Sequence, residues 1–264
     1  MITLYGGPTP NARKIAIALL EMGLDWRLEY IDILAGDQLT PEFLALNPNN
    51  KTPVIVDDEG PEGPSFVLWE TGAILLYLAE KTGRFVPADP AKRAICWQWL
   101  MFQVSGVGPM FGQEAHFTHY AKDRHEYAIA RYSREVDRLM MVIDKRLSEA
   151  EWLAGDDYTI ADMATLPYLR RQLIEKAGRF ANVDRWGAAM LERPAVAEGM
   201  TVGVARAETI EGGLTGFTDE HRAILWGDRQ HARRGGELPA WGEEREVLHF
   251  RHPGEGRDLA GASF

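Results

Sequence analysis

The sequence predicts two folded parts, a small α/β domain followed by an all-α domain, on three observations. Strand-like and helix-like segments alternate over residues 1–82, in the order of a βαβ unit followed by a ββα unit. Residues 83–90 contain two prolines and a glycine, which is typical of a linker. Over residues 91–204 the strand signals end and long apolar patterns with helical spacing take over. Residues 205–264 differ again and form an extension.

The first part begins with an apolar segment, residues 2–5, that predicts a strand. Gly6-Gly7-Pro8 predicts the turn after it, and apolar residues at helical spacing over 12–22 predict a helix that ends at Gly23. Asn11 then falls at or next to the start of this helix. The same criteria predict the remaining elements of the domain: a strand over 27–31, a helix over 41–46, strands over 54–56 and 66–69, and a helix over 72–81.

The second part contains four long apolar patterns with helical spacing. Thr159 and Asp162 stand three residues apart before the third of them, which is the reciprocal capping arrangement of a helix start. Cys96 falls inside the first pattern beside two tryptophans, so we expect a buried apolar residue and not a nucleophile. Glycines and Pro109 interrupt the sequence over 106–112, which predicts a kink that makes room for a ligand. The four predicted helices cover residues 91–104, 124–148, 160–176 and 183–192.

The extension is rich in glycine and weak in apolar periodicity. We expect it to dock only in part, through a short helix within residues 217–229, and the last ~30 residues to be disordered. His249 and His252 lack nearby carboxylate or cysteine support, so no metal site is expected.

Composition excludes several classes of protein. The net charge of −10 argues against nucleic-acid binding. One cysteine rules out an internal disulfide framework and a cysteine-based zinc cluster, and suits a reducing compartment. No apolar run approaches the ~20 residues of a membrane-spanning helix, and the first residues lack a secretion signal. We therefore expect a cytoplasmic protein whose partners are small molecules or proteins.

Two short segments predict a site for a small peptide-like ligand. Pro53 opens a buried strand after a polar turn, where a cis Thr52–Pro53 bond can turn backbone N–H and C=O groups outward. Glu70 and Thr71 then precede an apolar helix. The Glu70 carboxylate can hold an ammonium group, while Thr71 and the free N–H groups of the first helical turn can hold a carboxylate.

Thr9 and Asn11 flank the start of the first predicted helix, where open α/β sheets present ligands. A thiolate placed there would gain from free N–H groups and from the Thr9 hydroxyl or the Asn11 amide, which lowers the pKa of a thiol. The alternative is that both residues merely cap the helix.

Several strings, in this order, resemble the cytosolic glutathione transferases and specifically their bacterial nu class, over about residues 1–230. They are Pro8-Thr9-Pro10-Asn11, the segment 47–53 that ends in Lys51-Thr52-Pro53, the segment 72–83, and the segment 108–113 followed by His116-Phe117. The resemblance implies a thioredoxin-like first domain, a helical-bundle second domain, a homodimer, and glutathione as co-substrate without a metal.

Matched position by position, the resemblance also implies roles in binding glutathione. Thr52 would offer its backbone to the cysteinyl part beside cis Pro53, and Glu70 and Thr71 would hold the γ-glutamyl end. Threonine replaces the serine that most of the superfamily has after the acidic residue, but it keeps the hydroxyl. The remaining implied contacts are Gln38 and Lys51 near the glycyl carboxylate. Arg131 is a further candidate for binding glutathione, and the alternative is that it meets the partner subunit.

The activity implied by the resemblance is reduction of small disulfides by thiol–disulfide exchange, with weak conjugation or peroxidase activity. No cysteine lies near the first helix, so the sulfur would be that of glutathione, with Thr9 and Asn11 as donors. An ordinary transferase that conjugates electrophiles is the alternative, and a non-enzymatic binding protein is a third. A pocket for the second substrate would be lined by Gln113, His116, Phe117 and Tyr132. The alternatives are that these side chains meet the partner subunit, face solvent or bridge helices.

Overall fold

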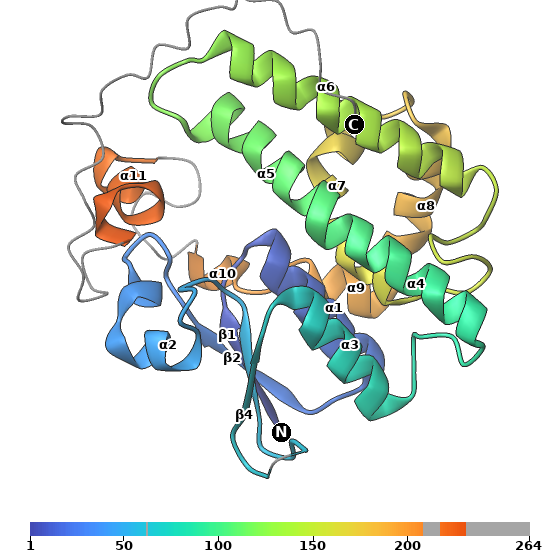
Figure 1. The fold of residues 1–264 in the computed structure, drawn as a ribbon, viewed down its shortest axis with the longest axis horizontal. Helices are drawn as coiled ribbons and strands as arrows, with labels where there is room; N and C mark the ends of the chain where they lie inside the picture. Colours follow the sequence, from blue (N-terminus) through green and yellow to red (C-terminus); the bar gives the residue numbers. More distant parts are fainter. Residues whose placement is uncertain (62, 208–216, 231–264) are drawn as a thin grey trace, which may run out of the picture.

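The structure, a computed structural model, describes residues 1–61, 63–207 and 217–230 (Figure 1). Its first part contains a four-stranded sheet in the order β2-β1-β3-β4. β1 pairs parallel with β2 and antiparallel with β3, and β3 pairs antiparallel with β4. This is the predicted α/β arrangement. The strands are β1 (Ile2–Gly6), β2 (Trp26–Tyr30), β3 (Val54–Asp57) and β4 (Phe66–Trp69).

Helix α1 (Pro10–Met22) starts two residues earlier than the apolar pattern indicates. Pro10 occupies its first turn and the Thr9 hydroxyl caps it, accepting a hydrogen bond from the Ala12 N–H at 3.2 Å. Asn11 therefore lies inside the first turn. The other helices of this part are α2 (Pro41–Leu46) and α3 (Thr71–Thr82), and a short 3₁₀ turn covers Asp37–Leu39.

Helix α1 is buried on all sides because it lies between the sheet and the helical part. Ile15, Ile17 and Leu19 are fully buried, and α1 contacts both α7 and α9. At Gly199 the two backbones approach so closely that a Cβ would lie 2.8 Å from the amide nitrogen of Ile17. Residues on α1 therefore face both parts of the molecule.

The helical part follows the predicted order. Figure 1 shows α4 and α5 continuing along one line. Gly106 lies between the two helices, whereas Gly108, Pro109 and Gly112 lie within α5. In place of a break, the backbone between α4 and α5 is π-helical over Gln103–Val107, and a second π-helical segment covers His116–Tyr120. The helices are α4 (Pro90–Phe102), α5 (Gly108–Ala115), α6 (Glu126–Leu147), α7 (Ile160–Glu175), α8 (Ala181–Leu191) and α9 (Pro194–Gly199).

The predicted capping box at the start of α7 is confirmed, and its carboxylate does more than cap. Asp162 is fully buried and accepts hydrogen bonds from the Thr159 N–H (3.0 Å), the Leu153 N–H (2.9 Å) and the indole N–H of Trp186 (2.9 Å). It therefore ties α7, α8 and the preceding loop together. Cys96 is fully buried, as predicted, and burial raises the pKa of its thiol.

Two helices of the extension are described, α10 (Val204–Ala207) and α11 (Asp219–Trp226), with a 3₁₀ turn over Asp228–Gln230. α11 confirms the expected short helix. Its Arg222 Nε donates to the Tyr120 carbonyl at 2.9 Å, and Asp219 pairs with Lys122 at 2.7 Å. The buried side chain of Ile224 lies next to Gly36 in the first part of the molecule. The expectations for the last ~30 residues, and for His249 and His252, concern residues outside the described part.

No helix within the described ranges is long and apolar enough to span a membrane.

Candidate active site

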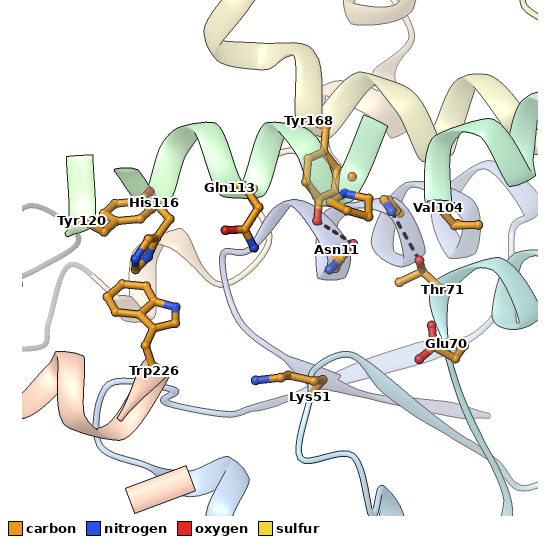
Figure 2. A pocket seen from close by; sticks show the side chains of 14 residues that line it. Asn11, Lys51, Glu70, Thr71, Val104, Gln113, His116, Tyr120, Tyr168 and Trp226 are labelled. Atoms are coloured by element: carbon orange, nitrogen blue, oxygen red, sulfur yellow. Dashed lines mark hydrogen bonds between the residues drawn. The ribbon is translucent and has the colours of Figure 1, made fainter. Parts of the chain in front are cut away.

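A cavity of about 640 Å³ lies where the starts of α1 and α3 meet α5. Figure 2 shows Glu70 and Thr71 at one end of it and His116, Tyr120 and Trp226 at the other. The cavity thus has a polar end and an aromatic end. Its lining consists of Asn11, Lys14, Lys51, Glu70, Thr71, Val104, Gly108, Pro109, Gly112, Gln113, His116, Tyr120, Tyr168 and Trp226.

Asn11 faces this cavity from the first turn of α1, near the positive end of the helix dipole. Its Oδ1 accepts a hydrogen bond from the Tyr168 hydroxyl at 3.2 Å. Because the carbonyl half of the amide is engaged in this way, the NH₂ half is left to act as a donor. Thr9 is not among the described residues that line the cavity, and its hydroxyl oxygen caps the helix.

The turn before β3 brings Lys51 to the cavity, directly ahead of the cis Thr52–Pro53 bond that the sequence predicts. The buried Asn47 holds this turn in place. Its Nδ2 donates to the Lys51 carbonyl at 2.7 Å, and its Oδ1 accepts from the Asn49 N–H at 2.9 Å. Asn47 thus supports the segment from within the predicted string.

Glu70 and Thr71 occupy the start of α3 as predicted. Glu70 has φ +71°, a left-handed conformation that costs a residue with a side chain roughly 1–3 kcal/mol. Surrounding structure holds it there, and its exposed carboxylate lines the cavity. The Thr71 side chain is buried next to it and accepts a hydrogen bond at 3.3 Å from the Lys14 Nζ.

Lys14 is a site residue that sequence reasoning missed. It is only 2% exposed, and its Nζ also donates to the Gln103 side-chain oxygen at 2.7 Å and lies 4.8 Å from the centroid of the Tyr168 ring. Burial lowers the pKa of Lys14 to about 7, against the opposing influence of the Glu70 carboxylate. Arg13 and Glu21 lie on the same helix, so the sequence around Lys14 does not single it out, and only its burial against the helical part reveals its place in the site.

The aromatic end of the cavity includes two of the four residues predicted for a second substrate, Gln113 and His116. His116 meets Trp226 edge to face at 4.7 Å between centroids, and burial lowers its pKa, which favours the neutral ring at pH 7. Phe117 and Tyr132 stack on each other at 5.5 Å and are not part of the described lining.

Sequence reasoning missed Tyr120 and Trp226. Trp226 lies on α11, more than a hundred residues after α5 in the sequence. Its ring stacks on that of Tyr120, with 5.8 Å between the ring centroids. An aromatic residue in the short helix of the extension was the available signal.

Gln38 and Arg131 are not brought to this cavity in the described part of the chain. Gln38 is buried in the first part, where its amide nitrogen donates to the Ile33 carbonyl at 3.1 Å. The Arg131 side chain is 55% exposed on α6 and lies 3.9 Å from the Glu135 carboxylate. Within the described ranges, no three histidine, cysteine, aspartate or glutamate side chains gather in a way that could hold a metal ion.

Comparisons with known proteins agree with this architecture. The family described as glutathione S-transferase, N-terminal domain, matches residues 9–81, and the family described as glutathione S-transferase, C-terminal domain, matches residues 100–194. The disulfide-bond oxidoreductase YfcG of Escherichia coli is 46% identical over 204 residues, which cover 76% of this chain and 94% of that protein. The disulfide-bond oxidoreductase YghU of the same organism is 40% identical over 217 residues, which cover 76% of this chain and 74% of that protein.

Solved structures show the same likeness. A glutathione transferase family member from Pseudomonas fluorescens, crystallised with two glutathione bound, superimposes with a TM-score of 0.73 at 42% identity and covers 76% of this chain and 92% of its own. A glutathione transferase from Pseudomonas putida, with one glutathione disulfide bound per subunit, gives a TM-score of 0.71 at 42% identity, with 75% and 90% covered. By sequence and by fold, this chain belongs to the glutathione transferase superfamily.

Proposed function

We propose that the cavity binds glutathione and uses its thiolate to reduce small disulfides. The polar end supplies what the γ-glutamyl group requires, since Glu70 can hold its ammonium, and Thr71 with the first turn of α3 can hold its carboxylate. Thr52 and Pro53 form the cis bond beside Lys51 and are not among the described residues that line the cavity; the Thr52 backbone would meet the cysteinyl part, and Lys51 would meet the glycyl carboxylate. The solved relatives that hold glutathione or its disulfide support this assignment.

The Asn11 amide is the proposed donor to the glutathione sulfur, because its NH₂ half has no hydrogen-bond acceptor among the described residues and lies beside the positive end of α1. Thr9 would assist only through its hydroxyl proton, since the oxygen already accepts a bond. Burial raises the pKa of Tyr168, so its phenol stays protonated and serves to orient Asn11.

The observation that carries the proposal is the position of the chain's one cysteine. Cys96 is fully buried and is not among the described residues that line the cavity. A thiol–disulfide reaction in the cavity must therefore take its sulfur from a bound ligand.

The proposed reaction has two exchange steps. A glutathione thiolate attacks the substrate disulfide, forming a mixed disulfide and releasing one thiolate, which takes a proton from solvent. A second glutathione thiolate then attacks the glutathione sulfur of the mixed disulfide, which releases the second thiol and glutathione disulfide. Two glutathiones are oxidised and one disulfide is reduced to two thiols.

The second substrate would occupy the aromatic end, against Gln113, His116, Tyr120 and Trp226. Phe117 and Tyr132 would not contact the second substrate directly, because Phe117 packs against His116 and Tyr132 stacks on Phe117. Conjugation of glutathione to an aromatic electrophile is the second candidate function, since the same aromatic end would suit it.

Membership of the nu class, a homodimer, and contacts of Gln38 and Arg131 with glutathione are further parts of this proposal. Arg131 would have to reach glutathione from outside the cavity of its own chain.

The test compares two reactions at equal enzyme concentration: reduction of hydroxyethyl disulfide, coupled to glutathione reductase and NADPH, and conjugation of 1-chloro-2,4-dinitrobenzene. We expect the disulfide reaction to have the higher kcat/KM and to fall by about 10² in Asn11→Ala. Faster conjugation, with slow disulfide reduction, would favour the second candidate.

A further inference from the structure

The side-chain nitrogen of Lys14 is buried, and among the described residues it has hydrogen-bond acceptors but no contacting anion. Its hydrogen-bond acceptors, Gln103 and Thr71, are neutral, and the Tyr168 ring covers another side. Glu70 is the charged group that acts on it, without a direct contact among the described interactions. Burying an ammonium group without a contacting anion is costly, so the site is poised to gain from an added negative charge.

The direction of the hydrogen bond to Thr71 has a consequence for a ligand. Because Lys14 donates to the Thr71 oxygen, the hydroxyl hydrogen must point away from Lys14. Both residues line the cavity, so this hydrogen can be donated to a carboxylate there. Lys14 would therefore orient the Thr71 hydroxyl and supply the positive charge behind it.

We propose that Lys14 is the buried counter-charge for the γ-glutamyl carboxylate, and that binding of this carboxylate makes Lys14 take up a proton. The inference rests on the proposed glutathione site and adds a positioning residue and a proton linkage to it. The amine in the free site passes to the ammonium in the bound site, with the proton supplied by the buffer.

Of the groups around this site, Lys14 is the one that we expect to change its protonation state when the carboxylate binds. The pKa of Lys14 is about 7 in the free site, so near neutral pH a large share of it is uncharged. Tyr168, on α7, has a raised pKa and keeps its proton. Glu70, at the start of α3, is the facing carboxylate and favours the protonated amine. Gln103 and Thr71 do not titrate.

The test is calorimetric titration with S-methylglutathione, which has the γ-glutamyl end but no thiol to ionise. Binding is measured in buffers of low and high ionisation enthalpy, at pH 6 and pH 7.5, so that the slope of the observed enthalpy gives the protons taken up. We expect about 0.7 proton per site at pH 7.5 and about 0.1 at pH 6 for the wild type. The wild-type measurement alone tests the linkage, whether or not a variant folds.

The variant Lys14→Met should bind about tenfold more weakly at pH 6 and take up no proton at either pH. Lys145→Met is the matched control, because Lys145 is an exposed lysine on α6 paired with Glu149, and it should behave as the wild type. If the wild type binds without proton uptake at pH 7.5, or if Lys14→Met takes up the same number of protons, the role of Lys14 is wrong but the glutathione site still stands. Failure of S-methylglutathione to bind the wild type would overturn the glutathione site itself.

Discussion

The burial of Lys14 predicts a specific pH dependence of stability in the unliganded protein. The ordinary pKa of a lysine is 10.5, and burial lowers that of Lys14 to about 7 in the folded chain. Between these two values the unfolded chain binds a proton that the folded chain does not. The free energy of unfolding therefore rises as the pH is raised from 7, and this contribution is lost as the pH falls back through 7.

The magnitude follows from the two pKa values. Between pH 7 and pH 9, linkage gives a contribution to the free energy of unfolding of about 2 kcal/mol from this one group. Lys14→Met keeps the length of the side chain and removes the titration. The difference in unfolding free energy, wild type minus variant, should therefore increase by about 2 kcal/mol from pH 7 to pH 9, whatever its value at pH 7.

Urea unfolding of both proteins at pH 7 and pH 9, at equal protein concentration, measures this difference. Other titrating groups contribute equally to both proteins and cancel. The exposed Lys145→Met should show no change with pH relative to the wild type. A difference for Lys14→Met that stays constant within about 0.5 kcal/mol would refute the reasoning that Lys14 loses its charge in the folded chain.

Three other predictions concern different contacts. Tyr168→Phe removes the hydroxyl that holds Asn11, so the pKa of bound glutathione, read from thiolate absorbance, should rise by about half a unit; an unchanged pKa would mean that Tyr168 does not orient the amide. Trp226→Ala should lower kcat/KM about tenfold for an aromatic disulfide and much less for hydroxyethyl disulfide, and an equal loss for both would contradict an aromatic subsite. Asp162→Ala leaves three buried N–H donors without their acceptor and should cost ~3 kcal/mol or more in urea unfolding. Asp89→Ala, which removes an exposed helix cap, should cost only about 1 kcal/mol, and similar losses for both would count against the network.

Most of the fold could be predicted from local patterns, because its elements carry their own signals. The helix over residues 41–46 and the strand over 66–69 were predicted with their observed bounds. The start of α1 was misjudged by two residues, because Pro10 and the Thr9 cap begin the helix before its first apolar residue. The segment with the glycines and Pro109 is irregular as expected, since a π-helical segment covers Gln103–Val107, and Gly108, Pro109 and Gly112 line the cavity.

The candidate site was predictable where it depends on local sequence. Asn11, Lys51, Glu70 and Thr71 all line one cavity, as the strings around them indicate. Lys14 was missed because its significance lies in its burial among other helices, which no local pattern reveals.

Contacts between distant segments account for the remaining differences. Trp226 reaches the cavity from a helix that follows residues outside the described part. Gln38 was expected from the family resemblance and Arg131 from its place on a helix of the second part, and neither is among the described residues that line the cavity.

The central claim is that this cavity holds glutathione as a thiolate beside Asn11. The most direct test is to titrate the thiolate absorbance of glutathione bound to the wild type and to Asn11→Ala. The account predicts a bound thiol with a pKa well below its free value of about 8.5 to 9, and a return toward that value in the variant. Glutathione that binds with an unshifted pKa, or a shift that survives in Asn11→Ala, would contradict it.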